Sequence, residues 1–254
     1  MRVLSRYLLH ALSAGAIALC AAAAEAAQTN VAVAANFTDA AKEIAQAFGE
    51  KTGHEAILSF GSTGQLYTQI TQDAPFEVFL AADDERPRKA ADEGLAVPDS
   101  RFTYAIGRIV LWSTDPDLVR GAKTLENGDF SKIAIANPVG APYGAAAVPA
   151  MQALGVYHRL EPKIVQGNNI AQTYQFVQTG NAELGFVALS QVLNDAEGSR
   201  WEVPADLYEP IRQDAVLLKK GADSEAARAF MEFLKGPEAA AIIAKYGYGT
   251  AASS

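Results

Sequence analysis

Cysteine is almost absent from this sequence: among 254 residues there is one, Cys20. A disulfide framework, a Cys-ligated zinc site and an iron–sulfur cluster all need more cysteines, so each is excluded. The three histidines, His10, His54 and His158, have no metal-ligand spacing. We therefore expect no metal site of the cation-binding kind and no resident cofactor.

Basic residues are also scarce. Lys and Arg number 21 against 29 Asp and Glu, which gives a formal net charge of −8 and a pI of about 5.0. Nucleic-acid binding relies on clustered Lys and Arg, so a nucleic-acid partner is not expected. A mean hydropathy of +0.03 is too low for a protein that crosses the membrane several times. Half of the residues are hydrophobic and 20% are charged, as in a folded globular protein.

The one long apolar run lies at the N-terminus. It follows Arg2 and Arg6, covers residues 7–24 and ends in Ala24-Glu25-Ala26, with small residues on both sides of Glu25. A positive start, an apolar middle and a small-residue end predict a signal peptide, 1–26, cleaved near Ala26–Ala27. A membrane anchor is the alternative, but the run is short and alanine-rich. Cleavage would remove Cys20 and take the net charge from −8 to −9, because two arginines leave with one glutamate.

The remaining chain alternates short apolar runs with segments of helical periodicity. Strands are expected at 30–35, 55–60, 75–81, 106–113, 132–136, 163–166, 182–189 and 214–218, and helices at 40–48, 65–71, 84–93, 145–154, 171–179, 224–234 and 237–246. Repeated strand–helix units predict an α/β fold with mostly parallel sheets flanked by helices. Because the order strand-helix-strand-helix-strand occurs twice, we expect two similar lobes. The first would hold 27–105 plus 216–254 and the second 106–215, joined by a two-strand hinge whose strands cross near 103–107 and 211–216.

Four strand-to-helix junctions are rich in small neutral residues. They cover residues 34–38, 60–65, 137–144 and 167–171, and none contains Lys, Arg, Asp or Glu. In open α/β sheets, ligands bind at the carboxyl ends of strands, where the first N–H groups of each helix are unpaired. Each junction taken alone is more typical of an ordinary helix cap or turn than of a ligand site. Two such junctions in each half, facing one cleft, predict a site for a small, compact anion.

Six stretches in fixed order carry a family resemblance. They are VAVAANFT at 31–38, SFGSTGQL at 59–66, APFEVFLAAD at 74–83, IAIANP at 133–138, AELGFVA at 182–188 and FLKGPEAA at 233–240. Over nearly all of residues 29–249 the chain resembles the periplasmic molybdate-binding proteins of ABC importers. The resemblance implies the type II periplasmic-binding fold and a tetrahedral oxyanion held between two lobes.

The resemblance also implies the contact residues. The first contact falls on Asn36, whose side-chain amide can donate, and the second on the hydroxyl of Ser62 or Thr63. Backbone N–H groups of Tyr143 and Ile170 supply the third and fourth. Some members add a tyrosine hydroxyl at the position held here by Ala188, so either that contact is absent or the Tyr143 hydroxyl replaces it.

The function implied is that of a non-enzymatic periplasmic receptor for molybdate or tungstate. It would act as a monomer and deliver its ligand to the membrane permease and ATPase subunits of an ABC importer. A receptor for sulfate or phosphate is the alternative within the same class. An exported enzyme on this fold is a further alternative, but the predicted mature chain has no cysteine and no Gly-x-Ser-x-Gly motif. Tyr246 and Tyr248 are not adjacent, unlike the tyrosine pair of iron-binding relatives.

Overall fold

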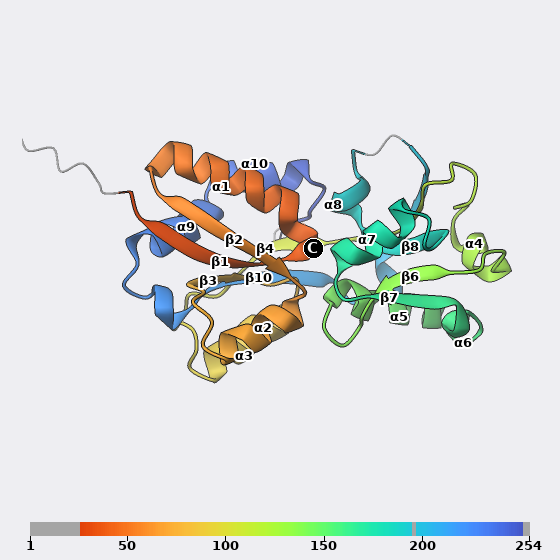
Figure 1. The fold of residues 1–254 in the computed structure, drawn as a ribbon, viewed down its shortest axis with the longest axis horizontal. Helices are drawn as coiled ribbons and strands as arrows, with labels where there is room; N and C mark the ends of the chain where they lie inside the picture. The colour runs from red at the N-terminus through yellow and green to blue at the C-terminus, as the bar shows by residue number, and fades with distance from the viewer. Residues whose placement is uncertain (1–25, 195–196, 251–254) are drawn as a thin grey trace, which may run out of the picture.

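The computed structural model describes residues 26–194 and 197–250, so the predicted signal peptide lies outside the described residues except for Ala26. Two lobes lie side by side, each built around one five-stranded sheet (Figure 1). The sheet of the first lobe has the order β2-β1-β3-β10-β4. Its strands are β1 (Gln28–Ala34), β2 (Glu55–Gly61), β3 (Val78–Leu80), β4 (Phe102–Gly107) and β10 (Ile211–Leu217).

Helices cover both faces of the first sheet because its strands are apolar on both sides. On one face lie α1 (Thr38–Thr52), α9 (Glu225–Lys235) and α10 (Pro237–Lys245), which share a core with Val31, Val33 and Leu80. On the other lie α2 (Thr63–Thr71) and α3 (Glu85–Asp92), around Phe79 and Val216. The short 3-10 helices η1 (Ala35–Phe37) and η4 (Lys219–Gly221) follow β1 and β10.

The second lobe repeats this arrangement with the strand order β7-β6-β8-β5-β9. Its strands are β5 (Ile109–Ser113), β6 (Ile133–Ala136), β7 (Ile164–Gly167), β8 (Leu184–Ala188) and β9 (Ser199–Glu202). Its helices are α4 (Ala122–Asn127), α5 (Pro142–Ala153), α6 (Tyr157–Leu160), α7 (Ile170–Gln178) and α8 (Leu189–Val192), with η2 (Glu161–Lys163) and η3 (Ala205–Leu207) between them. Helix α5 packs on one face of the sheet and α7 on the other.

The prediction of two similar α/β lobes with mostly parallel sheets is confirmed: in each sheet four of the five strands run the same way, and one strand, β10 or β5, runs against them. In each sheet two strand pairs are parallel and two are antiparallel. The antiparallel pairs arise because β5 and β10 occupy equivalent places beside β8 and β3, and each reaches its sheet directly from the other lobe. Parallel strands need helical crossovers, whereas these inserted strands arrive by short connections.

The connections between lobes lie close to the expected stretches but not within them. The predicted strand at 106–113 is divided at Arg108, because β4 pairs in the first sheet and β5 in the second. All of β10 pairs in the first sheet, so 106–107 and 211–215 belong with the first lobe rather than the second. The return connection runs through 203–210. Apolar residues continue on both sides of Arg108, so only strand pairing places the first boundary.

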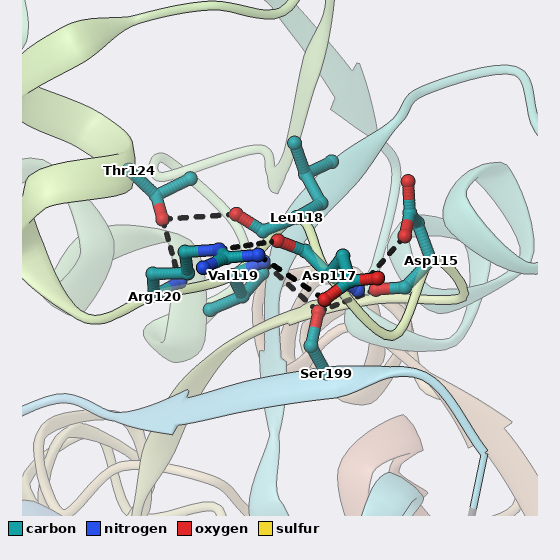
Figure 2. A network of polar contacts seen from close by, with 7 residues as sticks. All are labelled: Asp115, Asp117, Leu118, Val119, Arg120, Thr124 and Ser199. Atoms are coloured by element: carbon teal, nitrogen blue, oxygen red, sulfur yellow. Dashed lines mark hydrogen bonds and ion pairs between the residues drawn. The ribbon is translucent and has the colours of Figure 1, made fainter.

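The loop that follows β5 in the second lobe is held by hydrogen bonds among its own residues and with Ser199 (Figure 2). Thr124 accepts a hydrogen bond from the Arg120 N–H at 2.7 Å and donates to the Leu118 carbonyl at 3.1 Å. Ser199 of β9 bonds to Asp115 and Val119. None of these residues touches the pocket described below. Within the described residues, no helix is both long and apolar enough to cross a bilayer.

Candidate functional site

A small pocket lies between the lobes, where the carboxyl ends of β1, β2, β6 and β7 meet. It is narrow and partly open to solvent. The pocket is lined by all five residues expected from the sequence: Asn36, Ser62, Thr63, Tyr143 and Ile170. The other lining residues are Ala34, Ala35, Gly61, Ala82, Ala141, Pro142 and Asn169. None of the lining residues carries a charge. Nor does any group of three or more His, Cys, Asp or Glu in the described part of the chain have an arrangement that could hold a metal ion.

Two helices begin at the pocket with matching caps. Ser62 caps α2 and accepts a hydrogen bond from the N–H of Gln65, and Asn169 caps α7 and accepts one from the N–H of Gln172. A cap of this kind satisfies the third N–H of a helix and leaves the first without an intrahelical acceptor. Those first N–H groups belong to Thr63 and Ile170, one from each lobe.

Helix α5 supplies a third N-terminus. Pro142 stands at its first position and has no N–H, so the first N–H that the helix offers is that of Tyr143. Gly144, the next residue, lies against the end of β6, where an added Cβ would stand only 1.9 Å from the Ala136 carbonyl oxygen. The close approach permitted by this glycine places the Tyr143 N–H at the pocket.

The two neighbouring hydroxyls at the second junction differ in their partners. Ser62 Oγ donates to Gln65 Oε1 at 3.0 Å, as part of the capping box that also uses the Gln65 N–H. Thr63 Oγ1 accepts from the Ala82 N–H at 3.0 Å, and no acceptor for its own hydrogen lies among the described residues. A donor for a ligand is therefore available from Thr63, whereas the Ser62 hydrogen is already used.

The Asn36 side chain is only 5% exposed and faces protein acceptors. Its amide nitrogen lies 2.8 Å from Gln213 Oε1, 3.1 Å from the Tyr248 hydroxyl and 3.4 Å from the Tyr143 hydroxyl. Sequence reasoning did not find Gln213, and it considered Tyr248 only for iron. No local pattern could have revealed them, because both are more than 170 positions from Asn36 in the chain.

The tyrosine hydroxyls in this network are held neutral. Burial raises the pKa of Tyr104 and Tyr143 well above the ordinary value, and neighbouring tyrosines raise each further. Burial likewise raises the pKa of Tyr248, although its hydrogen bonds with Ser190 and Asn36 oppose the shift. At physiological pH these groups are therefore uncharged hydrogen-bond donors and acceptors.

The lobes touch at the mouth of the pocket. The Gly64 N–H donates to the Gly140 carbonyl at 2.9 Å, and Arg86, which also pairs with Asp83, donates to the Val139 carbonyl at 2.9 Å. Burial raises the pKa of Asp83, and Arg86 opposes that shift. On another side Ser190 Oγ donates to the Asn36 carbonyl at 3.1 Å. These contacts describe a closed cleft.

The family model described as bacterial extracellular solute-binding protein matches residues 29–249. The chain belongs to this family. This solute-binding protein is 58% identical over 244 residues to the molybdate-binding protein ModA of Rhodobacter capsulatus. The aligned region covers 94% of this chain and 97% of the relative. It is 57% identical over 244 residues to ModA of Azotobacter vinelandii, over 94% of this chain and 95% of the relative.

Among solved structures, the solute-binding protein is similar to the periplasmic molybdate-binding protein of Azotobacter vinelandii. The TM-score is 0.85 at 42% identity, covering 87% of this chain and 99% of the other. The sulfate-binding protein SubI of Mycobacterium tuberculosis gives a TM-score of 0.73 at 12% identity, which shows the fold alone. The predicted two-lobed fold is confirmed. These relatives are binding proteins by name, which supports the expectation that the chain is not an enzyme.

Proposed function

We propose that this solute-binding protein captures molybdate or tungstate in the pocket between its lobes, in the periplasm, and delivers it to the permease and ATPase subunits of an ABC importer. The observation that carries the proposal is a pocket lined by helix N-termini and hydroxyls without any carboxylate or cation. The two ModA relatives at 58% and 57% identity support the choice of ligand and the role in import.

A tetrahedral dianion without protons accepts hydrogen bonds and donates none. The N-termini of α2, α5 and α7 offer N–H groups at Thr63, Tyr143 and Ile170, and the positive ends of the helix dipoles point the same way. Because the chain is acidic overall, its net field does not attract an anion. Binding then depends on these local donors in a desolvated cleft.

Selectivity follows from the same donors. Sulfate carries the same charge as molybdate but is smaller, so it leaves donors without partners in a closed site. Phosphate at neutral pH carries a proton and needs an acceptor such as a carboxylate, which the pocket lining does not contain. An unpaired donor costs about 1–3 kcal/mol, so for each donor left unpaired sulfate or phosphate should bind about 5- to 150-fold more weakly than molybdate or tungstate.

Calorimetry of the purified protein against the four anions tests this proposal. We expect molybdate and tungstate to bind with similar affinity and the other two much more weakly. Equal competition by sulfate or phosphate would instead favour a general receptor for tetrahedral oxyanions.

The second junction gives a sharper test. Thr63→Val removes the available hydroxyl and should weaken molybdate binding about tenfold or more, since a hydrogen bond to a charged group contributes about 1.5–3 kcal/mol. Thr63→Ser keeps the hydroxyl and serves as the control. Ser62→Ala removes the α2 cap and should lower the free energy of unfolding by about 1 kcal/mol, with less effect on binding. Calorimetry and urea unfolding measure both, and a larger binding loss in Ser62→Ala would assign the contact to Ser62.

A further inference from the structure

The Asn36 side chain is enclosed by residues from distant parts of the chain. Gln213 comes from β10, Tyr143 from α5 of the second lobe, and Tyr248 from the segment after α10. We propose that Gln213 and Tyr248 are positioning residues, which hold Asn36 so that the first N–H groups of the 34–38 junction point into the pocket. In this proposal, which rests on the proposed function, the Asn36 side chain is an anchor and does not contact the oxyanion.

The number of hydrogens supports this role. An asparagine amide nitrogen carries two hydrogens. Three acceptors surround the Asn36 nitrogen at 2.8, 3.1 and 3.4 Å, all from the protein itself. No side-chain donor of Asn36 is left for a ligand. The donors that the junction can offer are backbone N–H groups at the start of η1, which have no helical carbonyl one turn earlier.

Gln213 is placed by an irregularity in the sheet. The pairing of β10 with β4 shifts register between Gln213 and Asp214, as in a β-bulge, and such irregularities re-aim side chains. Asp214 then binds Arg101 and Thr103, while Gln213, fully buried, faces the pocket side. Its Oε1 accepts from Asn36 at 2.8 Å and from the Tyr104 hydroxyl at 3.2 Å.

The other end of Gln213 reaches the second lobe. Its Nε2 donates to the Tyr143 hydroxyl at 3.2 Å. Gly107 leaves room for this contact, because an added Cβ would stand 2.3 Å from that hydroxyl and 2.7 Å from Gln213 Nε2. Gln213 therefore links the Asn36 junction of the first lobe to Tyr143 in the first turn of α5 in the second.

Tyr248 fixes the backbone of the same junction. Its hydroxyl lies 2.7 Å from the Asn36 carbonyl oxygen and 2.9 Å from Ser190 Oγ in the second lobe. Its ring packs on Phe37 with centroids 5.2 Å apart. Gly249, the next residue, exchanges two backbone hydrogen bonds with Ile106 beside the hinge. Since the network draws on both lobes, it is complete only in the closed cleft, and its loss should let the ligand leave faster.

The test uses Gln213→Met, which keeps the side-chain length without its polar groups, and the milder Tyr248→Phe. The control is Thr124→Val, which removes a buried hydroxyl from the loop of Figure 2; Thr124 does not line the pocket. Molybdate affinity is measured by calorimetry and dissociation by stopped-flow tryptophan fluorescence. We expect both network variants to weaken binding roughly tenfold, mainly through faster dissociation, and the control to bind like the unmodified protein.

A double-mutant cycle separates positioning from a general loss of stability. If Gln213 acts through Asn36, then Asn36→Ala combined with Gln213→Met should bind no more weakly than Asn36→Ala alone. Unchanged dissociation in Gln213→Met and Tyr248→Phe, or affinity losses that simply add in the cycle, would overturn the proposal.

The contacts of Asn36 with Gln213 and Tyr248 lie within the first lobe, so amide hydrogen exchange of the ligand-free protein tests them without any oxyanion. Exchange at 34–38 should be faster in Gln213→Met and Tyr248→Phe than in the unmodified protein, and unchanged in Thr124→Val. If the unmodified protein bound neither molybdate nor tungstate, the proposed function would fail, while this exchange result would still decide on the network. Equal protection of 34–38 in all variants would refute the positioning role.

Discussion

Gly144→Ala should lower molybdate affinity by up to about 150-fold, because a displaced N–H can no longer reach the anion and such a bond contributes up to about 3 kcal/mol. The added Cβ would stand 1.9 Å from the Ala136 carbonyl oxygen and 2.7 Å from its carbon. These are backbone atoms at the end of β6, so they cannot rotate away. The start of α5 must retreat and carry the Tyr143 N–H with it.

The same substitution should also destabilise the second lobe. Overpacking in a buried site costs about 1–3 kcal/mol and sometimes more, and we expect the upper end for a backbone clash of this size. Gly49→Ala in α1 is the matched control, since its Cβ would meet only the His54 carbonyl at 3.4 Å. It should raise the free energy of unfolding by up to about 1 kcal/mol and leave binding unchanged. Normal molybdate binding by Gly144→Ala would contradict the assignment of the Tyr143 N–H.

Gly64→Leu should weaken molybdate binding by roughly 100-fold while the ligand-free protein stays as stable as before. At Gly64 an added Cβ would stand 3.0 Å from Gly140 Cα and 3.2 Å from the Gly140 oxygen, across the gap between lobes. A leucine acts as a wedge there, and overpacking of about 3 kcal/mol corresponds to an affinity loss of about 150-fold. The open form has no such clash, so only closure is opposed.

Solution scattering with and without saturating molybdate measures closure directly. The unmodified protein should become more compact on binding, as hinge-type binding proteins do, and Gly64→Leu should not. Gly140→Ala, on the opposite side of the same contact, meets only Ser62 Oγ at an ordinary 3.5 Å and should have a much smaller effect. Full compaction of Gly64→Leu would show that the lobes do not need this contact to close.

The elements of the fold were predictable where the signals are local. The helix expected at 65–71 and the strand expected at 55–60 correspond to α2 and β2, because a capping residue and an apolar run mark them. The division at Arg108 was not predictable, since one apolar run feeds two sheets. Strand β9 was missed because alternating burial on a sheet edge leaves only a weak pattern over Ser199–Glu202.

The pocket itself was predictable from junction chemistry and family resemblance, since all five expected residues line it. The residues that hold Asn36 in place, Gln213 and Tyr248, were not predictable. Asn36 and Gln213 are 177 positions apart and Asn36 and Tyr248 are 212 apart, so their contact depends on how the whole chain folds back. A glutamine in a strand and a tyrosine near the C-terminus are unremarkable in sequence, and only their burial beside Asn36 gives them a role.

The second lobe is inserted in the chain between β4 and β10 of the first, and this has a consequence for the order in which the chain can fold. All strands of the second lobe lie within one continuous stretch, Ile109 to Glu202, so that lobe can form as soon as this stretch is available. The first sheet cannot be completed until β10 arrives, because β10 lies between β3 and β4. Contacts this distant in sequence form slowly, since a long loop must close before they contribute. Strands β1 to β3 can pair with one another early, but their sheet is joined to β4 only when β10 arrives from the last quarter of the chain.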